Sequence, residues 1–213
     1  MPTRSTPRTE HGDHGVAEPP RPRLGRRPKV GGEGIPEVFC ADEQHDVDVD
    51  LPRWQRLALN VITDQGVRGL AEMTLLFIGE IDMAELNTEH MNADGPTDVL
   101  SFPIDASDAE ITLDGEPPSR GPDRPPIDLG EIPLLLGDVV ICPAVAARNA
   151  PTHAGTLEDE LALLVVHGVL HVLGMDHADD DERAAMRAAE RRLLETYHWH
   201  GPAPAAFRQE QPE

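Results

Sequence analysis

Three of the ten histidines lie close together in the sequence, at His167, His171 and His177. Because His167 and His171 are four positions apart, a helix would place both rings on one face, a few ångströms from each other. This spacing can offer two imidazoles to one metal ion. Gly174 can end such a helix with a positive φ, so that the chain folds back and His177 supplies a third nitrogen. Three protein ligands leave a fourth position for water, which is typical of catalytic zinc.

An alternative interpretation is that these are core histidines without a ligand. Apolar residues accompany the first two, among them Leu163, Val166 and Leu170. An imidazole buried among such side chains is costly unless it is bonded, which favours a metal site. Three imidazoles suit zinc, but they would also accept nickel or copper. Asp176, beside the third histidine, could orient an imidazole or could serve as a turn residue.

The residue after the first histidine limits the chemistry. The spacing His-x3-His-x5-His matches that of the metzincin metalloproteases, in which a glutamate at this position activates the zinc-bound water. Here the position is Gly168, which has no side chain. A base must therefore come from elsewhere, or the metal alone must lower the pKa of water. A zinc hydrolase acting on peptides or small molecules is weakened as a hypothesis but stays open.

The elements that must position these residues are predicted to be both helices and strands. Thr156 is a suitable N-cap for a helix that reaches about residue 173. The hydrophobic pattern predicts strands at residues 38–41, 72–78, 98–102 and 136–142, and further helices at residues 52–64, 82–91 and 180–197. The predicted fold class is α+β, a small mixed sheet of about four strands packed with helices, with the zinc site at a helix turn near the C-terminal third.

Composition divides the chain into segments. Residues 1–36 hold seven of the 21 prolines and seven of the 18 basic residues, which predicts a disordered basic tail. Its cations could contact RNA or an acidic partner; alternatively it is a solvated extension or reflects a misassigned start codon. Residues 37–200 are predicted to form the folded domain, with an acidic, proline-rich loop at residues 105–134. Residues 201–213 are expected to be a disordered tail.

The charge and the cysteines exclude some classes of protein. A formal charge of −21 argues against a protein that coats polyanions broadly, although a small local site for nucleic acid remains possible. Cys40 and Cys142 are too few for a disulfide framework and are expected to be buried free thiols. The first thirty residues lack the apolar stretch of a signal peptide, and the longest apolar run is shorter than a membrane span. We therefore expect a soluble, cytoplasmic protein.

The run from His167 to His177, His-Gly-x-Leu-His-x-x-Gly-x-Asp-His, resembles the signature of the YbeY endoribonucleases. Three other blocks resemble the family's, in the same order: Glu85-Leu86-Asn87 followed by residues 96–103, residues 136–141, and Glu158-Asp159-Glu160. The resemblance covers about residues 38–197. The histidine motif is specific, and the other blocks are moderately so.

The resemblance implies a function. Members of this family are metal-dependent endoribonucleases that cut single-stranded rRNA during maturation of the small-subunit rRNA 3′ end and in ribosome quality control. It implies one Zn²⁺ per chain, held by His167, His171 and His177. It also implies rRNA, small-subunit ribosomal proteins and the GTPase Era as partners, with no membrane. The strand at residues 98–102 and Asp138 are expected near the metal.

One departure from the family leaves the catalytic residues unknown. Many members carry an arginine where this chain has Met91. A cation there would suit the charge that develops on a cleaved phosphodiester. Either Arg148 or a tail arginine replaces it, or the metal suffices, or cleavage is weak. An alternative is therefore a metal-stabilised ribosome-assembly factor without catalysis.

Overall fold

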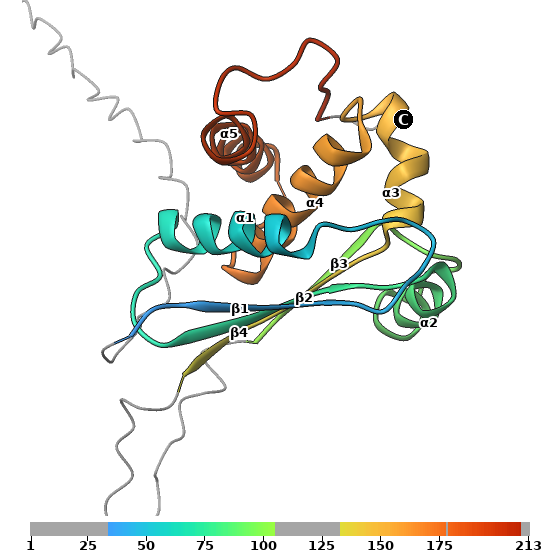
Figure 1. Cartoon of the computed structure of the whole chain (residues 1–213), viewed down its shortest axis with the longest axis horizontal. Coiled ribbons are helices and arrows are strands. Elements are labelled where there is room, and N and C mark those ends of the chain that lie inside the picture. Colours follow the sequence, from blue (N-terminus) through green and yellow to red (C-terminus); the bar gives the residue numbers. More distant parts are fainter. Residues whose placement is uncertain (1–33, 105–132, 178, 210–213) are drawn as a thin grey trace, which may run out of the picture.

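A four-stranded mixed sheet lies at the centre of the protein (Figure 1). The computed structural model describes residues 34–104, 133–177 and 179–209. The strand order is β1-β2-β4-β3. Strands β1 (Glu37–Asp42), β2 (Ala71–Phe77) and β4 (Leu134–Ile141) run parallel, and β3 (Val99–Pro103) pairs antiparallel with β4. This confirms the predicted α+β class with its mixed sheet.

In the described part of the chain, five α-helices pack around the sheet. They are α1 (Leu51–Asp64), α2 (Glu80–Met91), α3 (Pro143–Asn149), α4 (Leu157–Val172) and α5 (Asp180–Tyr197). Figure 1 shows α1, α4 and α5 stacked over one face of the sheet, with α2 near its end. The short helix α3 was not predicted, because Pro143 was interpreted only as the end of a strand although proline is also favoured in a first helical turn.

Helix α4 is buried on nearly every side. It lies against the sheet and also contacts α1 and α5. A helix that is apolar all round must be enclosed in this way, which explains the long apolar run in the sequence. The smaller apolar cluster, with Met83 and Val140, lies on the other face of the sheet. The polar side chains of α4 therefore stand out as functional candidates.

A glycine allows α4 to approach the sheet closely. A Cβ atom at Gly168 would lie 2.5 Å from Cγ1 of Val139 and 3.3 Å from Oγ of Ser101. The hydroxyl of Ser101 donates a hydrogen bond of 3.4 Å to the carbonyl oxygen of Gly168. Gly168 therefore faces β3 and β4, and this contact sets the position of the histidines on either side of it along α4.

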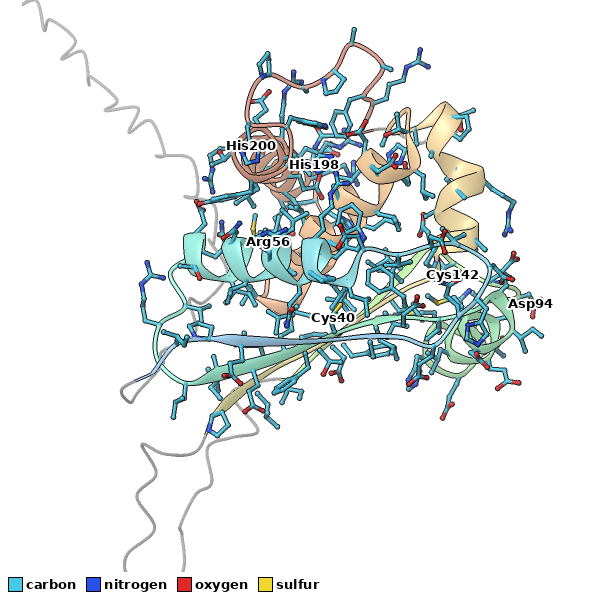
Figure 2. The ribbon with its side chains drawn as sticks, in the orientation of Figure 1. Cys40, Arg56, Asp94, Cys142, His198 and His200 are labelled. Carbon is cyan, nitrogen blue, oxygen red and sulfur yellow. The ribbon has the colours of Figure 1, made fainter. Side chains whose placement is uncertain are left out.

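The cysteines agree in part with the expectation of buried free thiols, and the C-terminal segment contacts the core. Both cysteines are free, with Cys142 buried and Cys40 half-buried (Figure 2). Residues 201–209 belong to the predicted C-terminal tail, and here the ring of Phe207 packs edge-on against Trp199, 4.7 Å between centroids. The backbone N–H of Arg208 also donates to the carbonyl oxygen of His153, so more than one contact attaches this segment. The basic tail up to residue 33, residues 105–132 of the acidic loop and residues 210–213 lie outside the described residues.

No helix in the described ranges is long and apolar enough to cross a bilayer.

Replacing Gly168 by alanine tests the close packing of α4. Helix propensity alone would stabilise the variant by roughly 1 kcal/mol. The clash with Val139 is expected to outweigh this, lowering the free energy of unfolding by about 1–3 kcal/mol in urea titrations. Adding Val139→Ala should recover part of that loss in a double-mutant cycle. A more stable Gly168→Ala protein would contradict the packing described.

Candidate metal centre

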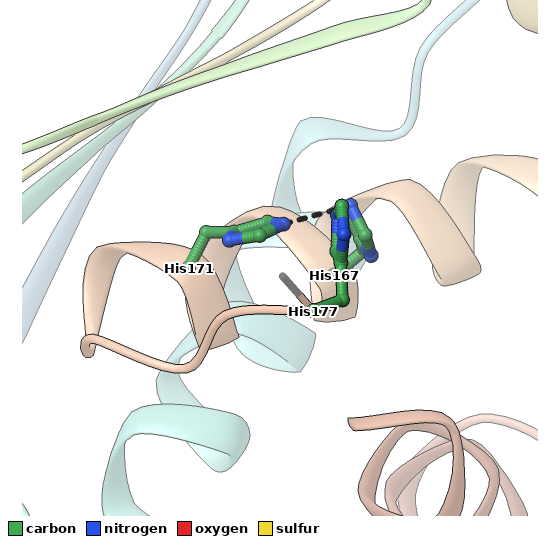
Figure 3. A group of neighbouring side chains, drawn as sticks. All are labelled: His167, His171 and His177. Atoms are coloured by element: carbon green, nitrogen blue, oxygen red, sulfur yellow. Dashed lines mark hydrogen bonds between the residues drawn. The ribbon is translucent and has the colours of Figure 1, made fainter. Parts of the chain in front are cut away.

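The three histidines predicted from the sequence meet at one point (Figure 3). One ring nitrogen from each of His167, His171 and His177 lies within 4.8 Å of the others. The Nε2 atoms of His167 and His171 are 3.1 Å apart. The ring of His177 lies 4.9 Å from that of His171 and 5.8 Å from that of His167, between centroids. Three converging imidazole nitrogens are a donor set that fits zinc.

The turn after α4 brings the third histidine back. Gly174 has φ +86°, and its N–H donates to the carbonyl oxygen of His171 while that of Met175 donates to Leu170. These bonds satisfy the last carbonyls of the helix and reverse the chain. Asp176 accepts the backbone N–H of His177 at 2.7 Å. This contact is compatible with a turn role, and the orienting role of Asp176 stays a prediction.

A carboxylate from α5 contacts one of the imidazoles. Oε1 of Glu190 lies 2.7 Å from Nδ1 of His167, and its Oε2 accepts a hydrogen bond of 3.0 Å from Gln209. Glu190 is only 5% exposed. When Nδ1–H of His167 donates to this carboxylate, Nε2 keeps its lone pair for the centre, an arrangement common around metal-binding histidines.

Sequence reasoning missed Glu190. A signal was present, because Glu190 shares the buried face of α5 with Met186, Leu193 and Leu194. A carboxylate on an apolar helix face needs a partner.

Burial keeps His171 neutral. Desolvation, reinforced by the neighbouring His167 and His177, lowers the pKa of His171 to about 4. At neutral pH its ring is therefore uncharged, which is the form in which histidine binds a metal ion.

A cavity of about 260 Å³ opens beside the cluster, between α4 and α5. Carboxylates, imidazoles and guanidinium groups share its wall. Its polar lining is Asp98, His153, His167, His177, Arg183, Arg187, Glu190 and Gln209. The cations nearest the histidines therefore come from α5.

Met91 lies on the opposite side of the cluster. It lines a second cavity, of about 420 Å³, together with His167, His171 and Asp176. Position 91 thus does face the histidines, but it offers an apolar side chain. Arg148, considered as a replacement, bonds through both Nη atoms to Glu80 and lines neither cavity.

The two acidic residues expected near the metal are placed differently. Asp98 lines the cavity beside the histidines and accepts a hydrogen bond of 3.1 Å from Asn149 through Oδ2. Asp138 pairs with Phe102 in the sheet, and strand alternation places it on the face of Val140, away from α4. The two residues differ because Asp98 lies just before β3 at the cavity, whereas Asp138 lies within β4 and points to the opposite face of the sheet.

His153 and Glu160 form a buried pair behind the cavity wall. Nδ1 of His153 lies 2.8 Å from Oε1 of Glu160, which is fully buried. The hydrogen bond to Glu160 raises the pKa of His153 and outweighs the effect of burial. The pair fixes the segment between α3 and α4, from which His153 reaches the cavity.

Comparison with known proteins identifies the family. A family model described as endoribonuclease YbeY matches residues 39–198. The chain belongs to the YbeY endoribonuclease family. A YbeY endoribonuclease of Salinispora tropica is 43% identical over 150 residues, covering 70% of this chain and 89% of the relative. One from Acidothermus cellulolyticus is 44% identical, covering 70% and 84%.

A solved structure also matches. The solution structure of a Thermotoga maritima protein is 22% identical, with a TM-score of 0.47, and the match covers 76% of this chain and 90% of the other.

Glu190→Gln tests the orienting contact at the centre of this YbeY family member. The amide keeps the size of the side chain but weakens the hydrogen bond to His167. We expect the affinity for Zn²⁺, measured by competition with a chromophoric chelator, to fall about 10–100-fold. The matched control is Glu195→Gln, which changes a half-buried carboxylate of the same helix that contacts Arg191 rather than a histidine. Equal affinities in the two variants would contradict the role of Glu190.

The His153–Glu160 pair predicts a pH dependence of stability. Because folding raises the pKa of His153, its stabilisation is complete below about pH 6.5 and is lost as the pH rises through the folded-state pKa. The free energy of unfolding of the natural protein should therefore exceed that of His153→Gln most at low pH. A difference that does not change between pH 5.5 and 9 would rule out the ionised pair.

Proposed function

We propose that this chain is a metal-dependent endoribonuclease that hydrolyses phosphodiester bonds of single-stranded rRNA, in maturation of the small-subunit 3′ end and in ribosome quality control. The convergence of three imidazoles beside an open cavity, in a chain matched by the YbeY family model over residues 39–198, carries this proposal. The relatives named above are endoribonucleases.

The residues present fit a zinc ion. His167, His171 and His177 would hold it, and Glu190 would orient His167. A bound divalent ion would supply Lewis acidity that polarises a phosphoryl oxygen and lowers the pKa of water. The ionised form of Glu190 also offsets positive charge at the centre.

Arg183 and Arg187 take the place of the missing family arginine in this proposal. Both line the cavity next to His167 and His177. A guanidinium group binds phosphate oxygens through paired N–H donors, which Met91 lacks, and Arg148 lines neither cavity beside the histidines. The substrate phosphate would therefore enter from the α5 side of the cluster rather than from the side of Met91.

Recognition must be local. The chain has 39 acidic and 18 basic residues, so most of its surface repels a polyanion. A few cations beside the centre would contact the strand, and a partner could deliver it. Small-subunit ribosomal proteins and the GTPase Era remain predicted partners from the family resemblance, as does a cytoplasmic location.

A peptidase function is disfavoured by the direction of Gly168. A glutamate base at this position would point into Val139 and Ser101 rather than toward the centre. The base of the metzincin mechanism therefore has neither a side chain nor space here.

Purified protein loaded with Zn²⁺ should cleave single-stranded RNA, and His171→Ala should abolish cleavage. The loss should exceed about 100-fold, because removing an outer partner of a ligand alone typically costs about 10–100-fold. His45→Ala, at an exposed loop position, is the matched control. Chelation should stop the reaction and Zn²⁺ should restore it, while casein should stay intact.

Cleavage that survives in His171→Ala would indicate a contaminating nuclease or a different site. A folded, zinc-loaded protein that never cuts RNA with any divalent metal would favour the assembly-factor alternative, in which the metal only stabilises the fold.

A further inference from the structure

A second cationic cleft lies where the start of α1 meets the end of α5. Its volume is about 390 Å³, enough for a phosphate with its sugar. Arginine and histidine side chains dominate its polar lining. The residues that carry the argument are Arg53, Arg56, His198, His200 and Asp50. Figure 2 shows Arg56 on α1, with His198 and His200 beyond the end of α5.

The arginines of this cleft are not neutralised by ion pairs. Five other described arginines bond carboxylates or backbone carbonyls: Arg68, Arg148, Arg183, Arg191 and Arg192. Within the described ranges, Arg53 and Arg56 form no ion pair. Asp50 also lines the cleft, but its Oδ1 accepts the backbone N–H of Arg53 as the helix N-cap. In a chain of net charge −21, two neighbouring arginines without a carboxylate partner favour an external anion as their ligand.

Buried groups hold Arg53 in place. Its guanidinium lies 4.7 Å from the ring centre of Trp54, and Nη2 lies 3.5 Å from Nδ1 of His198. Nε2 of His198 is 2.9 Å from Oδ1 of Asp159, which also accepts the indole N–H of Trp199. The carboxylate of Asp159 therefore accepts a hydrogen bond from Nε2–H of His198, and the lone pair on Nδ1 faces Arg53.

His198 itself stays neutral. Burial lowers its pKa and outweighs the raising effect of Asp159. The cationic groups that face the cleft are thus the two guanidiniums, and the one on Arg53 is oriented before any ligand arrives. Pre-orientation of this kind reduces the entropy lost on binding.

We propose that this cleft binds a backbone phosphate of the RNA, away from the bond that is cut. Planar guanidinium groups match phosphate oxygens, and the ring of His200 at the rim adds a further donor. The inference rests on the proposed function only in naming RNA as the source of the phosphate. Tyr197, which lines the cleft, is seven residues beyond Glu190, or about 10 Å along the α5 axis. A few nucleotides of one strand can therefore reach both sites.

The test is the salt dependence of RNA binding by the full chain. Fluorescence anisotropy with a labelled single-stranded 12-mer, checked on a gel for integrity, gives Kd at several salt concentrations. The double variant Arg53→Gln/Arg56→Gln should bind about 10-fold or more weakly, with a salt slope reduced by about two. Arg56→Gln alone, at an exposed position, should reduce the slope by about one. Arg191→Gln, which removes an exposed arginine of α5, is the matched control and should leave the slope unchanged.

Control variants and a competition measurement distinguish the possible outcomes. Arg56→Lys should retain most of the slope, and circular dichroism should show the natural fold in every variant. Inorganic phosphate at constant ionic strength should compete with the RNA; phosphate binding at the cleft that the RNA cannot displace would overturn RNA as the ligand.

Unchanged affinity and salt slope in the double variant would overturn the inference, while continued cleavage would leave the proposed function standing. Arginine-dependent binding without cleavage would support the cleft and reject the function. A natural protein that binds no RNA would reject both.

Discussion

The hydrogen bond between His167 and Glu190 joins the two helices that form the candidate centre. It fixes the tautomer of His167 and connects α4, the most deeply buried helix, to α5. Without a carboxylate on α5, the Nδ1 proton of His167 would need another acceptor in the wall of the cavity. The same helix brings Arg183 and Arg187 to the cavity wall. Because α5 packs on α4, one helix supplies both the carboxylate that contacts His167 and the two arginines of the cavity wall.

Helix α4 has to meet two opposing requirements. It must bury an almost continuous apolar surface, and it must expose imidazole nitrogens at one end. Gly168 reconciles them, because the absence of a Cβ lets the helix settle on Val139 and Ser101 while the side chains of its neighbours point to the cavity. Gly168 therefore leaves the position of the peptidase base without a side chain, and it also allows α4 to pack closely on the sheet.

Much of the fold and the ligand set could be predicted from local pattern. The spacing of His167, His171 and His177 is readable because helix geometry and a glycine turn act over a few residues. Glu190 was missed because its partner lies 23 positions away, and no periodicity records such a contact. The sheet face to which Asp138 points likewise depends on its position in β4. The attachment of residues 201–209 through Phe207 depends on where Trp199 lies in space.

Charge distribution explains how a strongly acidic chain can act on RNA. The positive charge that could meet a phosphate lies beside the histidine cluster and in the cleft at the end of α5. Both sites depend on an oriented group behind them, Glu190 in one and the Asp159–His198 pair in the other. Orientation of a few groups can thus replace a broad basic surface.

The central claim is that three imidazoles of this chain hold one metal ion. X-ray absorption spectroscopy of the zinc-loaded full chain tests it most directly. The account predicts one ion per chain with three nitrogen ligands at about 2.0–2.1 Å and one oxygen ligand, and loss of the imidazole signal in His171→Ala. Zinc surrounded by carboxylate oxygens, or imidazole coordination that is unchanged in that variant, would contradict it.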